Sequence, residues 1–573
     1  MTDLVITNAN LVDGSGTPSR MADISVSDGR ITEVAPVGQI SRGSQRIIDA
    51  QGLLVTPGFV DIHTHYDAQV SWDPMLTPSS WHGVTTAVMG NCGVGFAPAH
   101  PDRHQWLIEL MEGVEDIPGA AMTDGIDWQW ESFPEYLDSV DQRNYVIDVG
   151  TQIAHGALRA YVMGQRGADN EPANADDCVN MARLVEEALR AGALGFSTSR
   201  TPLHKSKSGE LVPGTMVDPA ELYAIADAMA SVGHGNFQFS PEHVRVPIEE
   251  WPWMRELAQR SGRPVSVNLS QTDQSPDLWR SVLELLTQAH IDGIPIYSQV
   301  AGRSIGIMYC LEGSAHPLLF HPAYAEVQNL PMKERLQALK EPARRERLLN
   351  EVPNDGGLFQ KIVLDKLDGM WLVDGSDIDY EPRREDSIGG TARRTGANPM
   401  QLIVDQLCSN DGNGMIYAPF FNYSYGDLSM AYEAHRHPHT RMGLSDAGAH
   451  CGAICDGGMP TFMLTHWTRD RTRGPRLPLE FIVHRQTRQT AEFYGLHDRG
   501  LIAPGMRADI NIIDYDNLGF DVPRMAYDLP ANGRRLVQHG KGYTATFVAG
   551  VQTVDNDSFT GELPGRLIRG PQR

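Results

Sequence analysis

The sequence predicts an α/β fold, a (β/α)8 barrel joined to a small β-sandwich that both chain termini build. Segments of alternating apolar and polar residues with Asp-Gly turns lie at both ends, such as DLVITNANLVDG and YTATFVAGVQTVDN, and predict short antiparallel strands. Between them, short apolar runs alternate with helical patterns such as CVNMARLVEEALRA, which indicates parallel strands with helical connections. The 573 residues can hold a barrel of ~250 residues or more with an appended domain.

Eight apolar runs in the middle of the chain are predicted to be the barrel strands. In chain order they are GFVDIHTH, TTAVMGN, YVIDVGTQI, GALGFSTS, GNFQFSP, PVSVNLS, IPIYSQVA and RMGLSDA. In a (β/α)8 barrel the functional residues lie at the carboxyl ends of the strands. Candidate site residues are therefore sought where these runs end.

The same patterns divide the chain into parts. We expect residues 1–56 and 486–556 to form the two halves of the sandwich, and residues 57–485 to form the barrel. Residues 557–573 are left as a tail. Strand and helix signals lose their regular alternation over 303–440, so we expect a long insertion there before the last barrel strand, which would act as a lid or pocket wall.

Composition and charge narrow the possible partners. The net charge of −24 argues against nucleic acid and against anionic membranes as partners. The expected partner is a small-molecule substrate. The start of the chain lacks the features of a signal peptide, and no apolar run is long enough for a transmembrane helix. The six cysteines are widely spaced, so a reducing cytoplasm is expected. Self-association into a homo-oligomer stays open.

Two histidines at the end of the first run are the strongest candidates for metal ligands. His63 and His65 are two residues apart, so on a strand their side chains point to the same side, together with that of Asp61. At the mouth of a barrel two imidazoles suit a divalent metal with an open coordination position, such as zinc. The spacing is undemanding, however, and two hydrogen-bonded histidines at a strand end are the alternative.

The wider sequence context resembles a known family. VTPGFVDIHTHYD resembles the opening motif of the amidohydrolase superfamily, and LVITNANLVDGSG and LIAPGMRADINIIDYD resemble its sandwich strands. Within it, MGNCGVGFAP is most similar to the N-acyl-D-amino-acid deacylases (D-aminoacylase-like, amidohydrolase 3). The resemblance implies a metal-dependent hydrolase of a C–N amide bond, first of all in an N-acyl-D-amino acid. A cyclic amide, a carbamoyl group or a lactone is the alternative substrate.

The resemblance also assigns roles to Cys92 and Asp446. It implies that Cys92, at the end of the second strand, is a metal ligand, and that Asp446, in GLSDAGAH, contacts the metal and its water. A carboxylate there can act as general base and then as general acid. Without the family, Cys92 would be a buried cysteine and Asp446 could cap a helix.

Two positions depart from the family pattern. The family has a histidine at the end of strand five and another at the end of strand six, where this chain has Ser240 and Asn268. Hydroxyl and amide oxygens are weaker zinc ligands than imidazole. We therefore expect one zinc ion per subunit rather than two, and His243, three residues after Ser240, is a further candidate ligand. The expected ligand set is His63, His65, Cys92 and Asp446.

Other polar residues near strand ends are candidates for substrate binding. They are Tyr66, His155, Arg200, Asn268 and His450. The lysine and arginine that hold the substrate carboxylate in better-known deacylases have no clear match here, since LSQTDQS and AHCGAICDGG stand at those places. Because two ligand positions are replaced, a non-catalytic binding or assembly protein is an alternative. The retention of His63, His65 and Asp446 argues against this alternative. A metal-assisted isomerase or lyase is a further alternative.

Overall fold

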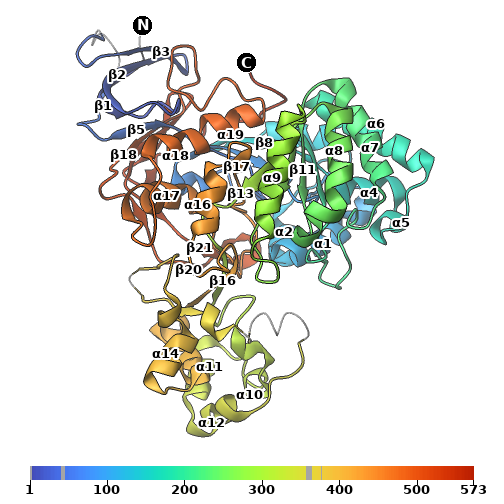
Figure 1. Cartoon of the computed structure of the whole chain (residues 1–573), viewed down its shortest axis with the longest axis vertical. Helices are drawn as coiled ribbons and strands as arrows, with labels where there is room; N and C mark the ends of the chain where they lie inside the picture. The colour runs from blue at the N-terminus through green and yellow to red at the C-terminus, as the bar shows by residue number, and fades with distance from the viewer. Residues whose placement is uncertain (1–2, 41–45, 357–363, 365, 376) are drawn as a thin grey trace.

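The computed structural model describes residues 3–40, 46–356, 364, 366–375 and 377–573. Helices and strands alternate along most of this chain, which confirms the mixed α/β class (Figure 1). In Figure 1 the first strands lie beside the late strand β18, and a helical lobe from the middle of the chain projects at the opposite end. None of the described helices is long and apolar enough to cross a membrane.

One nine-stranded sheet draws strands from both ends of the chain. Its order is β25-β24-β23-β18-β5-β1-β2-β3, with β4 paired to β1. Its strands are β1 (Leu4–Leu11), β2 (Arg20–Ser27), β3 (Arg30–Ala35), β4 (Arg46–Asp49), β5 (Leu54–Pro57), β18 (Ile510–Ile513), β23 (Tyr543–Val548), β24 (Val551–Asp555) and β25 (Ser558–Phe559). The antiparallel pairing of β5 with β18 joins the two ends, and Val55 and Ile512 are partners across it. Alternate residues such as Ile6, Ile24 and Phe547 pack into one buried cluster, as strand geometry requires.

Two parallel sheets form the central part of the molecule. Their orders are β6-β7-β8 and β9-β10-β11-β12-β13-β17. The strands are β6 (Phe59–Asp61), β7 (Val84–Met89), β8 (Asp148–Thr151), β9 (Ile153–Ala154), β10 (Gly195–Ser199), β11 (Asn236–Ser240), β12 (Val265–Asn268), β13 (Ile296–Val300) and β17 (Thr440–Met442). These nine strands overlap the eight predicted runs. The numbers differ because the third run is interrupted at Gln152 and so gives two strands, β8 and β9. A parallel bridge between Thr64 and Ala447 brings the segments after the first and last strands together.

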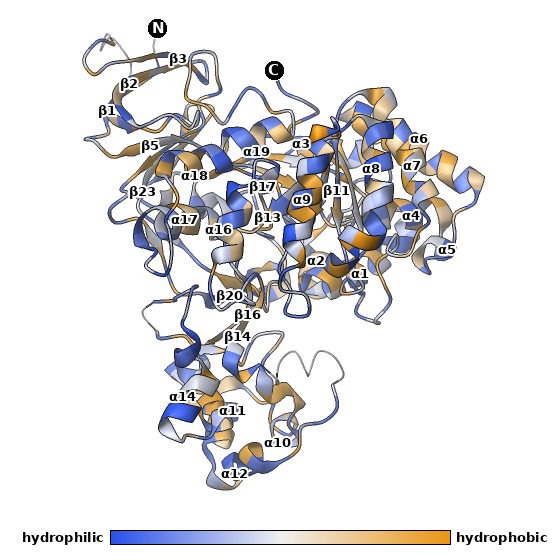
Figure 2. Ribbon diagram, viewed as in Figure 1, coloured by the Kyte–Doolittle hydropathy of each residue, from blue (hydrophilic) through white to orange (hydrophobic). Residues whose placement is uncertain are grey.

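Amphipathic helices connect these strands. They are α1 (His104–Glu115), α2 (Gly119–Gly125), α3 (Phe133–Asp141), α4 (His155–Met163), α5 (Gln165–Ala168), α6 (Ala175–Ala191), α7 (Pro219–Val232), α8 (Trp251–Ser261), α9 (Leu278–Ile291), α16 (Ser429–Arg436), α17 (Met459–Thr465), α18 (Leu479–Gln486) and α19 (Arg488–Phe493). Helix α6 shows why they form: Asn174 caps its start in a capping box with Asp177, and it buries Met181, Val185 and Ala188 at helical spacing. Figure 2 shows hydrophobic and hydrophilic residues on the same helices, so that one side can pack on the strands.

The insertion has a core of its own. It contains an antiparallel sheet of order β14-β16-β15 and several short helices. The elements are β14 (Ile305–Tyr309), α10 (Pro322–Ala325), α11 (Met332–Lys340), α12 (Pro342–Asn350), β15 (Trp371–Leu372), α14 (Ile388–Thr395), α15 (Pro399–Leu407) and β16 (Ile416–Phe421). Leu339, Leu348, Ile403 and Ile416 lie in a separate buried cluster. This lobe is the projecting part of Figure 1, and β16 leads from it back to the central strands.

Two short antiparallel strand pairs lie between β18 and β23. They pair β19 (Gly519–Phe520) with β22 (Gly540–Lys541), and β20 (Arg524–Leu529) with β21 (Gly533–Val537). The last residues return to the central sheet, where Leu567 bridges Val149 of β8. The chain after β25 is thus packed against a central strand.

Candidate metal centre

Four of the predicted ligands meet at the carboxyl ends of three parallel strands. His63 and His65 follow β6, Cys92 follows β7 and Asp446 follows β17. The ligand atoms of His63, His65 and Cys92 lie within 4.8 Å of one another. His63 Nε2 is 3.2 Å from Cys92 Sγ and 3.2 Å from Asp446 Oδ1, and His65 Nε2 is 3.6 Å from Asp446 Oδ1. Among the residues that the structure describes, His63, His65 and Cys92 form a group that could hold a metal ion, and Asp446 lies beside them.

Tight local turns aim Cys92 and Asp446 into the cluster. Both have left-handed backbone conformations, with φ of 57° and 46°, which residues other than glycine adopt rarely. Gly93 follows Cys92 at φ 73°, and a Cβ there would come within 2.7 Å of the Ser199 amide nitrogen. The backbone after β7 therefore passes too close to β10 for any side chain. Asp446 N also donates to the His63 carbonyl, which ties the last strand to the first.

Gln299 of β13 orients His63. Its Oε1 accepts a hydrogen bond of 2.6 Å from His63 Nδ1, while its Nε2 donates to Ser266 Oγ. With its Nδ1 carrying the proton, His63 presents a lone pair at Nε2, the atom that faces Cys92 and Asp446. Gln299 was not predicted, although a polar residue in the buried run IYSQV was a signal that could have found it.

Glu115 supports His65 and was also missed. It ends α1, is 1% exposed, and places Oε1 3.4 Å from His65 Nδ1 and Oε2 3.6 Å from His450 Nε2. The sequence carried a weak signal that Glu115 is buried and paired. Glu115 continues the spacing of Leu107, Ile108 and Met111 on the buried face of α1, where a carboxylate needs a partner.

Ser240 and Asn268 form a chain of hydrogen bonds that ends on the Cys92 sulfur. Gln238 Nε2 donates to Asn268 Oδ1, Asn268 Nδ2 donates to Ser240 Oγ, and Ser240 Oγ donates to Cys92 Sγ at 3.0 Å. Gln238 also accepts from the Cys92 amide nitrogen. The two residues that replace the family histidines thus contact the candidate ligand Cys92 and stabilise a thiolate there.

The chemistry of this donor set fits a zinc ion. Two imidazoles, a thiol and a carboxylate are all groups that zinc binds. Burial raises the pKa of the Cys92 thiol, but His63 and His65 lower it to about 7. Burial likewise lowers the pKa of His63, while Cys92 and Asp446 raise it to about 9. Anionic groups at Cys92 and Asp446 thus favour positive charge at the centre of the cluster, which a bound divalent metal would supply.

We predict that Glu115→Gln weakens zinc binding by about 10–100-fold, the usual effect of losing an outer partner of a ligand. Glutamine keeps the size of the side chain but removes the charge beside His65. The dissociation constant would be measured by competition with a chelator. Glu112→Gln is the matched control, because Glu112 lies three residues earlier on α1 and pairs with Lys207 instead. Equal zinc affinity in both variants would contradict a role for Glu115.

The remaining predicted site residues divide into two groups. Asn268, His243 and His450 line the pocket beside the cluster, and the His243 ring packs 5.3 Å from that of Phe421. Three others have different partners: Tyr66 is buried and donates to Ser79, His155 pairs with Glu221, and Arg200 pairs with Glu250. None of these three lines that pocket.

The pocket itself is small, and its described lining holds neither arginine nor lysine. Its volume is about 210 Å³. His65, Cys92 and Asp446 line it together with Phe420 and Phe421 of β16. A small neutral group can therefore reach the cluster.

A sequence profile of the amidohydrolase family matches residues 46–554, which is most of the chain. The chain belongs to the amidohydrolase family. The protein is therefore an enzyme of this family, and the resemblance of VTPGFVDIHTHYD to the family's opening motif is confirmed.

Curated relatives and solved structures agree with this assignment. D-aminoacylase of Alcaligenes xylosoxydans xylosoxydans is 36% identical over 313 residues, 53% of this chain and 58% of its own. N-acyl-D-aspartate deacylase of the same organism is 24% identical over 99% of this chain and 95% of its own. The structure of an N-acyl-D-glutamate deacylase of Bordetella bronchiseptica, bound to zinc and a phosphonate inhibitor, superposes with a TM-score of 0.64 at 22% identity, covering 99% of this chain and all (100%) of the other. This amidohydrolase enzyme therefore shares the fold of the D-aminoacylases.

Proposed function

We propose that this amidohydrolase is a metal-dependent deacylase that cleaves the amide bond of an N-acyl compound, first of all an N-acyl-D-amino acid. The observation that carries the proposal is the convergence of His63, His65, Cys92 and Asp446 at strand ends. Relatives that are named as a D-aminoacylase, an N-acyl-D-aspartate deacylase and an N-acyl-D-glutamate deacylase support the proposal. The two parallel sheets would form one (β/α)8 barrel over about 57–485, with the site at its mouth.

A single zinc ion per subunit suits the ligands best. Ser240 and Asn268 are engaged with Cys92 and with each other, so they offer no strong second set of ligands. A structure of D-aminoacylase is described as showing one-metal activation and second-metal attenuation, which supports one metal being sufficient.

All six cysteines are free, which suits a reducing cytoplasm.

The catalytic roles follow from the positions of the side chains. A bound metal would supply a Lewis acid and lower the pKa of water towards ~7. Asp446, which lines the pocket, takes a proton from the attacking water and later gives it to the leaving nitrogen. Gln299 and Glu115 hold His63 and His65 in orientation, and His450, beside Glu115, faces the pocket and can contact the substrate.

Metal analysis combined with a substrate screen tests this function. The protein would be purified without added metal, its zinc content measured, and its activity tested on N-acyl-D- and N-acyl-L-amino acids, cyclic amides and lactones. We expect about one zinc per chain and the highest activity on an N-acyl-D-amino acid. Activity on cyclic amides or lactones alone would move the assignment to those substrates. A protein that neither holds nor takes up zinc would be a binding or assembly module instead.

A further inference from the structure

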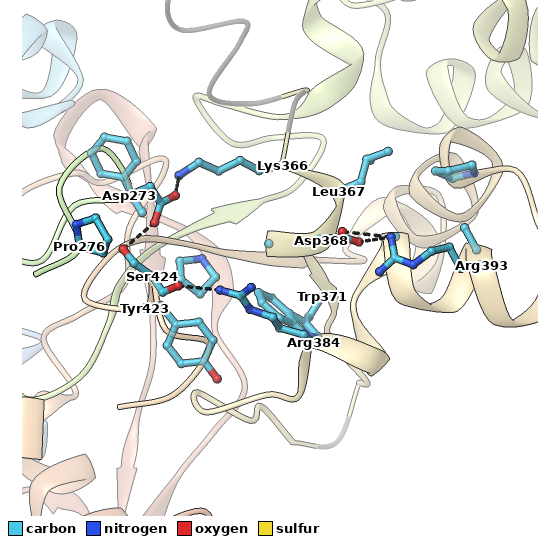
Figure 3. Close-up of a pocket in the computed structure, with 16 residues that line it drawn as sticks. Asp273, Pro276, Lys366, Leu367, Asp368, Trp371, Arg384, Arg393, Tyr423 and Ser424 are labelled. Atoms are coloured by element: carbon cyan, nitrogen blue, oxygen red, sulfur yellow. Dashed lines mark hydrogen bonds and ion pairs between the residues drawn. The ribbon is translucent and has the colours of Figure 1, made fainter. Parts of the chain in front are cut away.

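A second and larger cavity lies between the insertion and the central strands. Its volume is about 590 Å³ (Figure 3). Residues around Trp371, helix α14 and the end of β16 contribute from the insertion, and Asp273 and Pro276 contribute from the loop between β12 and α9. No residue of the metal cluster lines it.

The walls of this outer cavity are mainly apolar. The apolar and aromatic side chains are Pro276, Leu367, Trp371, Ala392, Pro399, Pro419, Phe420 and Tyr423. The charged groups nearby are largely occupied with one another: Lys366 Nζ lies 2.5 Å from Asp273 Oδ2, and Arg393 lies 2.7 Å from Asp368, as Figure 3 shows. Such a cavity favours an apolar ligand group, because paired charges gain little from a new polar partner.

The outer cavity adjoins the catalytic pocket. Phe420 lines both of them, and the next residue, Phe421, lines the catalytic pocket. The loop after β12 is also shared, since Ser270 lines the catalytic pocket while Asp273 and Pro276 line the outer cavity. The same two segments therefore form walls of both spaces. The catalytic pocket, at about 210 Å³, has little room for a long substituent, whereas the outer cavity has about 590 Å³.

We propose that the outer cavity binds a long apolar substituent of the substrate, with Phe420 between this substituent and the reacting amide. The proposal rests on the deacylase function and adds a substrate class to it. The group that this cavity would bind is an extended hydrocarbon chain, which belongs either to the acyl part or to the amine part of the substrate.

Two substrate series test the inference and distinguish the two sources. One lengthens the acyl group from acetyl to decanoyl on a fixed D-amino acid, and the other lengthens the amino-acid side chain on a fixed acetyl group. In one series, kcat/KM is expected to rise roughly tenfold for every two methylenes that reach the outer cavity. If kcat/KM is flat or falls with length in both series, the inference is overturned.

A cavity-filling substitution shows where the length dependence arises. Ala392 of α14 lines the outer cavity, so Ala392→Trp is expected to remove the preference for long substrates and to leave the acetyl substrate unaffected. Thr395→Trp is the control, because Thr395 is exposed on the same helix and does not line the cavity. Ala392→Leu serves if the tryptophan variant does not fold. Equal length dependence in the Ala392 and Thr395 variants would overturn the inference.

Direct binding separates failure of this inference from failure of the proposed function. Decanoate would be titrated calorimetrically into the zinc-loaded wild type and both variants. Binding that Ala392→Trp weakens at least tenfold, and Thr395→Trp does not, supports the outer site even if no N-acyl substrate is cleaved. Absence of decanoate binding to the wild type, together with normal cleavage of an acetyl substrate, would leave the deacylase standing and reject the outer site.

Discussion

Replacing Asp446 with asparagine is expected to lower kcat by about 10²–10⁴-fold, the range for loss of a general acid–base group. Asparagine keeps the size and one oxygen of the side chain but cannot accept a proton from water. Neighbouring His63 and His65 hold the pKa of Asp446 far below its ordinary value against the effect of burial, so it is ionised in the folded protein. Steady-state kinetics on the best substrate would be measured together with zinc content.

The control for this experiment is another buried carboxylate. Asp456 lies ten residues later and bonds Arg303 at 2.9 Å instead of facing the metal cluster. Asp456→Asn is expected to lower the melting temperature while the folded enzyme keeps its kcat. An Asp446→Asn variant with wild-type kcat would exclude the proton-transfer role proposed above.

Replacing Cys92 with alanine is expected to abolish stoichiometric zinc binding. The sulfur lies 3.2 Å from His63 Nε2 and receives the hydrogen bond of Ser240, so it is the side chain around which the cluster is arranged. The loss of zinc affinity should exceed the ~10–100-fold effect of losing an outer partner such as Glu115. Zinc per chain would be measured after dialysis against buffer containing a weak chelator.

Cys455 provides the matched control. It is as deeply buried as Cys92, but its carbonyl bonds Arg303 and it is outside the metal cluster. Cys455→Ala should therefore retain one zinc ion and most of the activity. If Cys92→Ala also retained a full complement of zinc, the ligand set would have to be sought without a thiolate.

The strands and the histidines of the candidate metal cluster could be predicted because their signals are local. A buried strand is an apolar run, and the side chains that follow it must emerge at the same edge of the sheet. This pointed to His63 and His65, while Cys92 and Asp446 were singled out by the family resemblance. The structure brings all four side chains together, although about 350 residues separate Cys92 from Asp446 in the chain.

Residues that act through another residue could not be predicted in the same way. Glu115 and Gln299 matter because a helix end and a distant strand place them behind the two histidines, and sequence spacing does not reveal such a contact. Conversely, His155 and Arg200 were candidates for substrate binding but do not line the pocket. Both follow strand ends in sequence, but buried carboxylates on other segments, Glu221 and Glu250, hold their side chains elsewhere.

The pairing of β5 with β18 has a consequence for synthesis on the ribosome. The partner of Val55 is Ile512, so roughly 450 residues must be added after β5 before this contact can form, which takes about 20–90 s at ~5–20 residues per second. During that time the apolar side chains of β1 and β5 lack the partners that later cover them, and β5 is an open sheet edge. We therefore expect the nascent amino-terminal segment to need protection from aggregation until β18 has been made.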